Sequence, residues 1–282
     1  MILARRRPAG DDVHGLAPSH PRDGVESVRD DSGMPAGAAD VWIWAARPMP
    51  EHLLHEGLTE ADLDHVRRFR REGDRRRVAT GRVLLRAAAA QLAGIALDDV
   101  TVERHCARCG AAHGAPTLVL PRSAAPMHGS VSHAGAVVLV AVSAACPVGV
   151  DAERIDAVGF DGFDATALTA AERQTIASLP PADRNAARAT AWVQKEAVLK
   201  VQGLGMATAP DQVQVGVSRA DARLVPDPRA GRSTIALMNV AVGDGYRACV
   251  ACPLERIPVV RWADGSALLA GMAGASGTTT AR

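Results

Sequence analysis

The sequence has few aromatic residues, an odd number of cysteines and almost no net charge. One tyrosine, three phenylalanines and four tryptophans make up 3% of the 282 residues, so the core must be built from alanine, valine and leucine. Five cysteines in a chain of this length indicate reduced thiols rather than a disulfide framework. A formal net charge of +1 argues against general nucleic-acid binding as the main task.

Long apolar runs are also absent. None approaches the roughly 20 residues that a membrane-spanning helix needs. The basic start "MILARRRPAGDD" lacks the apolar segment that follows in a signal peptide. We therefore expect a cytoplasmic protein without a membrane partner. At 48% hydrophobic residues, the chain has enough material for one large domain or two small ones.

The distribution of small and periodic residues divides the chain into four parts. Residues 1–40 and 263–282 are rich in turn-forming residues without a period, and we expect both to be disordered tails. Between them, strands and helices follow one another in the same order twice, over 41–146 and over 147–262. We therefore predict an α+β fold made of two similar subdomains.

Local patterns predict the main elements of each half. Thr59 with Asp62, and Thr169 with Glu172, have the spacing of capping boxes that open helices, and Gly94 ends a long helix. The predicted long helices cover residues 74–94 and 182–203. The predicted strands cover residues 41–46, 100–105, 131–143, 147–153, 212–218, 233–242, 246–253 and 258–262.

Two acids end an apolar run at "PVGVDAE", residues 147–153. In a strand, Asp151 and Glu153 share one face, because side chains alternate. Carboxylates so close raise each other's pKa unless a cation neutralises them. Solvated acids at a strand end are the simpler interpretation, so the meaning of this pair depends on the rest of the chain.

A third carboxylate occurs in "WVQKEAVLK", residues 192–200. On a helix, Trp192, Glu196 and Lys200 lie in one stripe, because positions four apart share a face. Taken alone, Glu196 and Lys200 make a common surface ion pair. Together with the two acids, Glu196 would complete an all-oxygen set that suits Mg²⁺, and Lys200 would add a positive charge for phosphates. We expect Trp192 to pack beneath the site.

A hydroxyl and an imidazole occur in "GSVSHAGAVV", residues 129–138. Ser132 and His133 lie where a loop is expected to meet a buried strand, and they could hold a phosphate. A nucleophile pair is the alternative, but adjacent residues in an extended chain point apart and no G-x-S-x-G motif surrounds them.

Two further clusters leave alternatives open. Seven arginines in "RRFRREGDRRR" (67–77) fit a solvated helix face, an RNA-binding patch or a basic surface for an acidic partner. Cys106, Cys109 and His113 look like three zinc ligands, but four ligands at finger-like spacing are missing. We favour a turn for the cysteine stretch, and a mixture of nucleotide contact and solvated face for the arginines.

In their order and spacing, "SVSH", "VGVDAE" and "WVQKEAVLK" resemble the surfactin-type 4′-phosphopantetheinyl transferases. The resemblance covers most of residues 41–262 and includes "RRRVATGRVLLR" and "CARCGAAHGAP". It implies two pseudo-symmetric α+β subdomains with the active site between them. It also implies the activity of a holo-[acyl-carrier-protein] synthase, with coenzyme A as donor, Mg²⁺ as metal and a carrier-protein serine as acceptor.

The resemblance assigns metal and catalytic roles by position. Asp151, Glu153 and Glu196 match the metal carboxylates of the family, and Glu196 could instead, or also, help to deprotonate the attacking serine. Lys200 matches the lysine that contacts the phosphates and assists the departure of 3′,5′-ADP.

The resemblance also implies how coenzyme A and the carrier protein bind. Ser132 and His133 match residues that hold nucleotide phosphates, and Arg77 lies where the family contacts the adenosine 3′-phosphate. The acceptors expected from the family type are apo carrier proteins of polyketide, nonribosomal peptide or fatty-acid synthases. A chain that builds its own cleft from two halves needs no partner subunit, so we expect a monomer.

Four positions depart from the family, which usually has basic residues there: Asp62, His65, Ala115 and Leu204. Other arginines could take over these contacts. Two alternatives to the transferase remain. One is a noncatalytic regulator that binds coenzyme A or a nucleotide, and the other is a zinc-stabilised nucleic-acid binder that uses the arginine run.

Overall fold

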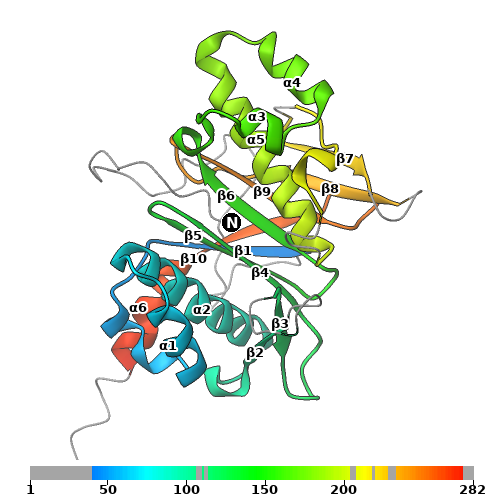
Figure 1. Ribbon diagram of the computed structural model, residues 1–282. Coiled ribbons are helices and arrows are strands. Elements are labelled where there is room, and N and C mark those ends of the chain that lie inside the picture. The colour runs from blue at the N-terminus through cyan, green and yellow to red at the C-terminus, as the bar shows by residue number, and fades with distance from the viewer. Residues whose placement is uncertain are drawn as a thin grey trace, which may run out of the picture.

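Two sheets lie face to face between two layers of helices (Figure 1). The computed structural model describes residues 40–105, 110, 114–203, 208–217, 220–227 and 233–275. The first sheet has the order β10 (Val260–Asp264), β1 (Val41–Ala46), β5 (Val137–Ser143), β4 (His128–Ala134), β3 (Pro116–Val119) and β2 (Thr101–Arg104). The second has the order β6 (Gly149–Arg154), β9 (Tyr246–Cys252), β8 (Thr234–Asn239) and β7 (Ala222–Pro226).

Each sheet carries one long helix on its outer face. The helix α2 (Glu72–Ala93) crosses the first sheet, beside α1 (Glu60–Arg67) and α6 (Gly265–Ala275). The helix α5 (Pro181–Val201) crosses the second, beside α3 (Phe163–Ala167) and α4 (Ala170–Ala177). Short 3-10 helices lie at Glu51–Leu53, His55–Gly57, Leu97–Asp99, Ile155–Val158 and Pro210–Gln212. The predicted α+β class with two similar halves is confirmed.

Three apolar layers hold these elements together. The first lies between α2 and the first sheet and contains Trp44, Leu84 and Val140. The second lies between the sheets, where strand alternation turns Ile43 and Val150 inward. The third lies between the second sheet and α5. Because a continuous apolar layer joins the two sheets, side chains from both halves can contribute to one site.

The predicted helix boundaries follow the local sequence closely. Both capping boxes form: Thr59 with Asp62 at α1, and Thr169 with Glu172 at α4. Gly94 ends α2 in the left-handed conformation, with φ 65°. No helix in these described ranges is both long and apolar enough to cross a bilayer.

Two strand predictions were wrong. Residues 131–143 do not form one strand: β4 and β5 are antiparallel neighbours, and the chain reverses at Gly135, which has φ 52°. Residues 212–217, expected to begin a strand, contribute only the end of a 3-10 helix and irregular backbone outside either sheet, with Gly216 at φ 70°. The first error came from the turn at Gly135, which the apolar run conceals. In the second case, alternating apolar residues could not reveal whether a neighbouring strand was within reach.

The predicted C-terminal tail was also wrong over part of its length. Residues expected to be disordered from 263 onward form the end of β10 and the helix α6, in which Leu269 is 1% exposed. Glycine and alanine give this segment low complexity, but its leucines bury an apolar face against the first sheet. The expected tails at 1–39 and 276–282 lie outside the described residues.

The strand β10 crosses the expected division of the chain. It pairs in parallel with β1, so a segment assigned to the second half completes the sheet of the first half. Asp40, the last residue of the expected N-terminal tail, supports this junction: it forms an ion pair with Arg256 at 2.6 Å and accepts a hydrogen bond from the Val259 amide. The division between residues 146 and 147 stays a prediction.

Candidate active site

The strand β6 places two acids toward α5. Its alternate residues Val150 and Ala152 are buried between the sheets, as the sequence pattern predicted. Gly149, Asp151 and Glu153 therefore point to the other side. There, a Cβ added at Gly149 would overlap the carbonyl oxygen of Ala197 in α5. The absence of a side chain at Gly149 lets the helix backbone approach the strand, and this brings Glu196 and Lys200 next to the two acids.

One carboxylate oxygen joins three of the predicted site residues. Asp151, 7% exposed, accepts a hydrogen bond at Oδ1 from Ser132 Oγ at 2.8 Å and an ion pair from Lys200 Nζ at 2.7 Å. Lys200 Nζ also donates to the carbonyl oxygens of Val150 at 2.8 Å and Val131 at 3.3 Å. The ammonium is thus fixed by one strand from each sheet.

The hydroxyls of two serines connect the sheets at this point. Ser132 Oγ accepts a hydrogen bond from the Ala152 amide at 3.1 Å, and Ser130 Oγ accepts one from the Val150 amide at 3.0 Å. These bonds satisfy amides of β6 on the side where it has no neighbouring strand. Ser130 was not predicted from the sequence. Its signal is the alternation S-x-S, which places both hydroxyls on one face of β4.

The other two carboxylates have raised pKa values, because burial and Asp151 outweigh the nearby cations. Burial raises the pKa of Glu196 to about 7; the negative charge of Asp151 adds to this shift and Lys200 opposes it. The pKa of Glu153 is also raised, by burial and by Asp151, although its carboxylate accepts a hydrogen bond from the Arg154 amide at 2.8 Å. Asp151 therefore repels both glutamates, which indicates that the three acids lie close together.

A divalent cation fits these residues in charge and chemistry. A hard cation prefers carboxylate oxygens and would relieve the repulsion that raises both pKa values. The geometry is not that of a finished site, since the described residues contain no group of three acidic, histidine or cysteine side chains arranged to hold a metal ion. Asp151 Oδ1 is engaged by Lys200, so the carboxylates and Lys200 would have to turn when a cation binds.

Arg77 of α2 and His133, near the end of β4, lie next to the turn between β4 and β5. Arg77 Nη1 donates to the Gly135 carbonyl oxygen at 3.1 Å, and its other terminal nitrogen forms an ion pair with Asp74. Desolvation and the positive charges of Lys200 and Arg77 lower the pKa of His133, so its ring is neutral at pH 7. His133 therefore lies within electrostatic reach of Asp151, Lys200 and Arg77.

The sole tyrosine fixes this turn and was missed by the sequence analysis. Tyr246 Oη accepts a hydrogen bond from the Ala136 amide at 3.0 Å, across the boundary between the sheets. A Cβ added at Gly135 would overlap the same hydroxyl. A single tyrosine in a strand gives no signal of this contact, because it depends on how the second sheet packs against the first.

Lys195, next to Glu196 in the sequence, has a structural position. Its ammonium is fully buried, forms an ion pair with Glu172 at 2.6 Å and donates to the carbonyl oxygens of Ala167 and Pro210. Glu172 Oε1 also accepts hydrogen bonds from the amides of residues 215 and 216. The pair joins α4, α5 and the loop after α5, so it orients the helix that carries Glu196.

The structure describes three of the four positions at which the sequence departs from the family. Asp62 caps α1 and forms an ion pair with Arg82, and the ring of His65 packs edge-on against Phe69. Ala115 lies just before β3. Leu204 and the expected zinc ligands Cys106, Cys109 and His113 lie outside the described residues.

Cys249 and Cys252 are free and buried in different apolar layers, so they do not form a shared metal site.

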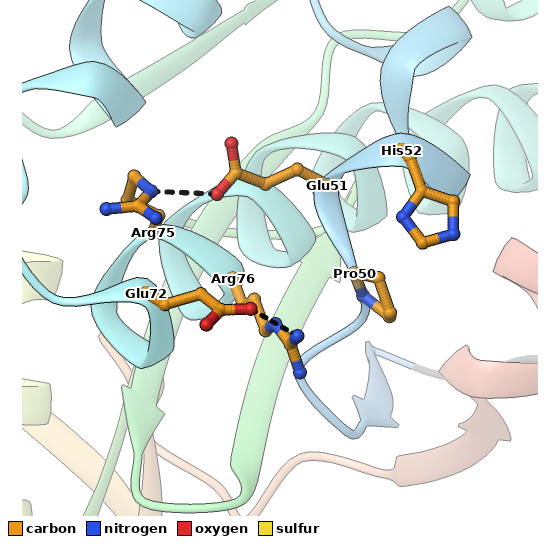
Figure 2. A pocket seen from close by; sticks show the side chains of 6 residues that line it. All are labelled: Pro50, Glu51, His52, Glu72, Arg75 and Arg76. Carbon is orange, nitrogen blue, oxygen red and sulfur yellow. Dashed lines mark hydrogen bonds and ion pairs between the residues drawn. The ribbon is translucent and has the colours of Figure 1, made fainter.

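The arginine run is largely paired with acids. Figure 2 shows a pocket of about 350 Å³ at the start of α2, where Arg75 contacts Glu51 and Arg76 contacts Glu72. Because both arginines that line the pocket are neutralised, it offers no surplus positive charge to an anion. The pairing favours the solvated-face interpretation for this part of the run, and none of the carboxylates described above lines this pocket.

Comparison with known proteins assigns both halves of the chain. A family model described as the 4′-phosphopantetheinyl transferase superfamily matches residues 147–251. A second model, described as 4′-phosphopantetheinyl transferase, N-terminal, matches residues 44–145. No curated protein matches the chain. The two matched segments meet between β5 and β6, and the serine hydroxyls of β4 in the first segment accept hydrogen bonds from β6 in the second.

Proposed function

Because this chain belongs to the 4′-phosphopantetheinyl transferase superfamily, we propose that it is a Mg²⁺-dependent holo-[acyl-carrier-protein] synthase. It transfers the 4′-phosphopantetheine arm of coenzyme A to a serine of an apo carrier protein. The serine oxygen attacks the β-phosphorus, the bond from that phosphorus to the bridging oxygen breaks, and 3′,5′-ADP leaves. The observation that carries the proposal is the meeting of Ser132, Lys200 and two repelled glutamates around Asp151.

The acids have two tasks in this proposal. Asp151, Glu153 and Glu196 would hold Mg²⁺, which when bound neutralises the pyrophosphate and the departing phosphate oxygen. Glu196 would also accept the proton of the carrier serine. Burial raises the pKa of this carboxylate to about 7 without a cation, and a bound Mg²⁺ would lower it, so the proposed proton transfer rests on the position of Glu196 beside Asp151 and Lys200.

The cations and the hydroxyl would bind coenzyme A. Lys200 forms an ion pair with Asp151 at 2.7 Å, and a cation that takes over the charge of Asp151 would release the ammonium to phosphates at the same place. The ring of His133 would donate a hydrogen bond to a phosphate oxygen, and Ser132 would do so once its hydroxyl turns away from Asp151, to which it donates in this structure. Arg77 would contact the nucleotide from the first turns of α2. Positioning and charge compensation supply most of the catalysis in reactions of this class.

The remaining parts of the proposal concern the setting of the enzyme. We expect the enzyme to be cytoplasmic. We also expect a monomer, because one chain supplies residues to the site from both sheets. We keep the division into subdomains at 41–146 and 147–262, with β10 exchanged into the first sheet. Its acceptors would be carrier proteins of polyketide, nonribosomal peptide or fatty-acid synthases, and the acidic helices of such proteins suit the arginines at the exposed end of α1.

Mass spectrometry of a carrier protein tests the reaction. Incubating an apo carrier protein with coenzyme A, Mg²⁺ and the enzyme should add the mass of phosphopantetheine. Asp151→Asn and Glu196→Gln should each lower the rate by roughly 10²-fold or more, as expected for loss of a general base or of a metal ligand. The matched control is Glu103→Gln, an exposed residue of β2, which should react at the wild-type rate.

Two results would contradict the proposal. If no carrier type gained mass although coenzyme A bound, a noncatalytic coenzyme A-binding regulator would be favoured. If Asp151→Asn reacted as fast as the wild type, the acids around Lys200 would not be the catalytic site.

A further inference from the structure

The turn between β4 and β5 contains a peptide that the two strands do not hold. Their pairing ends with Ala134 opposite Val137, which leaves Gly135 and Ala136 as a two-residue turn. The peptide that joins these two residues lies outside the ladder. Neither its amide nor its carbonyl has a backbone partner within the described part of the chain. Groups outside the hairpin are therefore needed to satisfy both.

Two side chains hold this peptide from opposite ends. The hydroxyl of Tyr246, at the start of β9, accepts a hydrogen bond from the Ala136 amide at 3.0 Å. Arg77 of α2 donates from Nη1 to the Gly135 carbonyl oxygen at 3.1 Å. The amide and the carbonyl of a trans peptide face opposite ways, so each contact fixes the direction of the other group. One peptide thus connects a side chain of the second sheet to a side chain of α2.

This connection sets the direction in which the peptide faces. Two-residue hairpin turns occur in forms that differ mainly in the orientation of their central peptide. Gly135, with φ 52°, is compatible with each of these forms, so contacts outside the hairpin decide between them. Tyr246 is well placed for this task. Its ring packs against the apolar layer between the sheets, and the residue pairs with Arg154 of β6.

The position of Arg77 depends on the same peptide. Its side chain is 24% exposed, and its other terminal nitrogen forms an ion pair with Asp74. Fixing an arginine side chain costs conformational entropy, and a ligand that meets an already fixed guanidinium does not bear this cost. A guanidinium also has more N–H donors than these two contacts use. Arg77 can therefore keep both contacts while it binds a further acceptor.

We propose that Tyr246 is a positioning residue, which acts through the peptide between Gly135 and Ala136 to hold the Arg77 guanidinium for coenzyme A. The inference rests on the proposed function, in which Arg77 contacts the nucleotide. Without the tyrosine hydroxyl, the Ala136 amide loses its acceptor and the peptide can turn away from Arg77. Binding of coenzyme A should then weaken, while the carboxylates around Lys200 keep their places.

The substitution Tyr246→Phe tests this role, because it removes the hydroxyl and keeps the ring. It should raise both the dissociation constant of coenzyme A, measured by calorimetry, and the KM for coenzyme A roughly five- to tenfold, as expected for the loss of one buried hydrogen bond. The kcat should stay within about twofold of the wild type, since the chemical step is unchanged. The matched control is Thr234→Val, which loses a hydroxyl that donates to the Leu254 carbonyl oxygen, beyond the other end of β9. It should keep all three wild-type constants.

A double-mutant cycle tests whether Tyr246 acts through Arg77. Arg77→Gln should weaken the binding of coenzyme A at least as much as Tyr246→Phe does. In the Arg77→Gln background, Tyr246→Phe should weaken it further by less than about twofold, because the peptide no longer has an arginine to hold. A purely structural role of the hydroxyl would give the same factor in both backgrounds.

Hydrogen exchange provides a measurement that depends on neither ligand nor catalysis. The Ala136 amide, followed by NMR, should exchange faster in Tyr246→Phe than in the wild type, because it has lost its acceptor. Amides in the centre of β9 should exchange as before, which shows that the variant is folded. The control Thr234→Val should leave the Ala136 amide unaffected.

Failure of this inference is distinguishable from failure of the proposed function. The inference is overturned if Tyr246→Phe binds coenzyme A as tightly as the wild type, if the two substitutions act independently, or if the Ala136 amide keeps its protection. In each of these cases, transfer of phosphopantetheine from coenzyme A can still be intact. Conversely, coupled losses of coenzyme A binding without any mass gain of a carrier protein support the role of Tyr246 and contradict the transferase.

Discussion

Glu196 shows how tertiary contacts change the chemistry of a single residue. In the sequence it forms part of an ordinary i,i+4 pair with Lys200. In the structure Lys200 is turned toward Asp151, and Glu196 is left half-buried beside a like charge, with a pKa of about 7. The folded protein therefore binds this proton more tightly than the unfolded chain, whose glutamates titrate near 4.5. Stability must fall as the pH rises between these two values.

The substitution Glu196→Gln should remove most of this pH dependence. Urea unfolding between pH 5 and pH 8 should show the wild type losing up to about 3 kcal/mol relative to Glu196→Gln, with most of the loss complete near pH 7. Millimolar Mg²⁺ at pH 7.5 should stabilise the wild type more than the variant, because the cation offsets the same repulsion. Parallel pH profiles for the two proteins would contradict the assignment.

At the scale of elements, the contact between β6 and α5 decides whether a site exists. The acids and Lys200 come from segments about fifty residues apart, and they meet because Gly149 lets the helix backbone lie directly on the strand. The first half uses a similar device, since Gly81 in α2 approaches Val131 of β4. In both halves a glycine therefore sets the distance between the long helix and its sheet.

The substitution Gly149→Ala should separate α5 from β6. The new Cβ would overlap the Ala197 carbonyl oxygen and lie 2.9 Å from the Val201 amide nitrogen, and backbone atoms cannot move aside as a side chain can. We expect a loss of about 1–3 kcal/mol in unfolding free energy, together with a large fall in transferase rate. Gly245→Ala is the matched control, since a Cβ there meets nothing within 4 Å. Equal stability of the two variants would refute this account of the packing.

At the scale of the whole molecule, the C-terminal segment closes the N-terminal half. The strand β10 pairs with β1, and α6 packs Leu269 into the layer between α2 and the first sheet. The chain thus returns to the sheet with which it began, and its two halves do not fold as two consecutive units. This arrangement predicts that a substitution at Leu269 destabilises an apolar layer built mainly from residues before 143.

The substitution Leu269→Ala should destabilise the protein by about 2–4 kcal/mol, because it leaves a cavity in a closely packed layer. Leu224→Ala, at a position 42% exposed, should change the free energy of unfolding by less than about 0.5 kcal/mol. Thermal or urea denaturation of the two variants checks the difference. If both behaved alike, α6 would not belong to the folded core.

The strongest sequence signals were those that depend on short-range geometry. Capping boxes, the glycine at the end of α2 and the long periodic helices formed where predicted. The family expected from three motifs is confirmed by the matches over both halves. Strand prediction failed at residues 131–143 and 212–217, and the segment from 263 onward was misread as disordered. Pairing partners and burial of small apolar residues decide these cases, and neither is encoded locally.

The sequence by itself determined which chemical groups the protein carries and the local faces on which they lie, because alternation in strands and the helical repeat are properties of the backbone. Tertiary structure alone decided which groups meet. It directed Lys200 to Asp151 and gave Glu196 its raised pKa. Each of these outcomes depends on burial and on charges contributed by distant segments, so it exists only once the two sheets and their helices have packed.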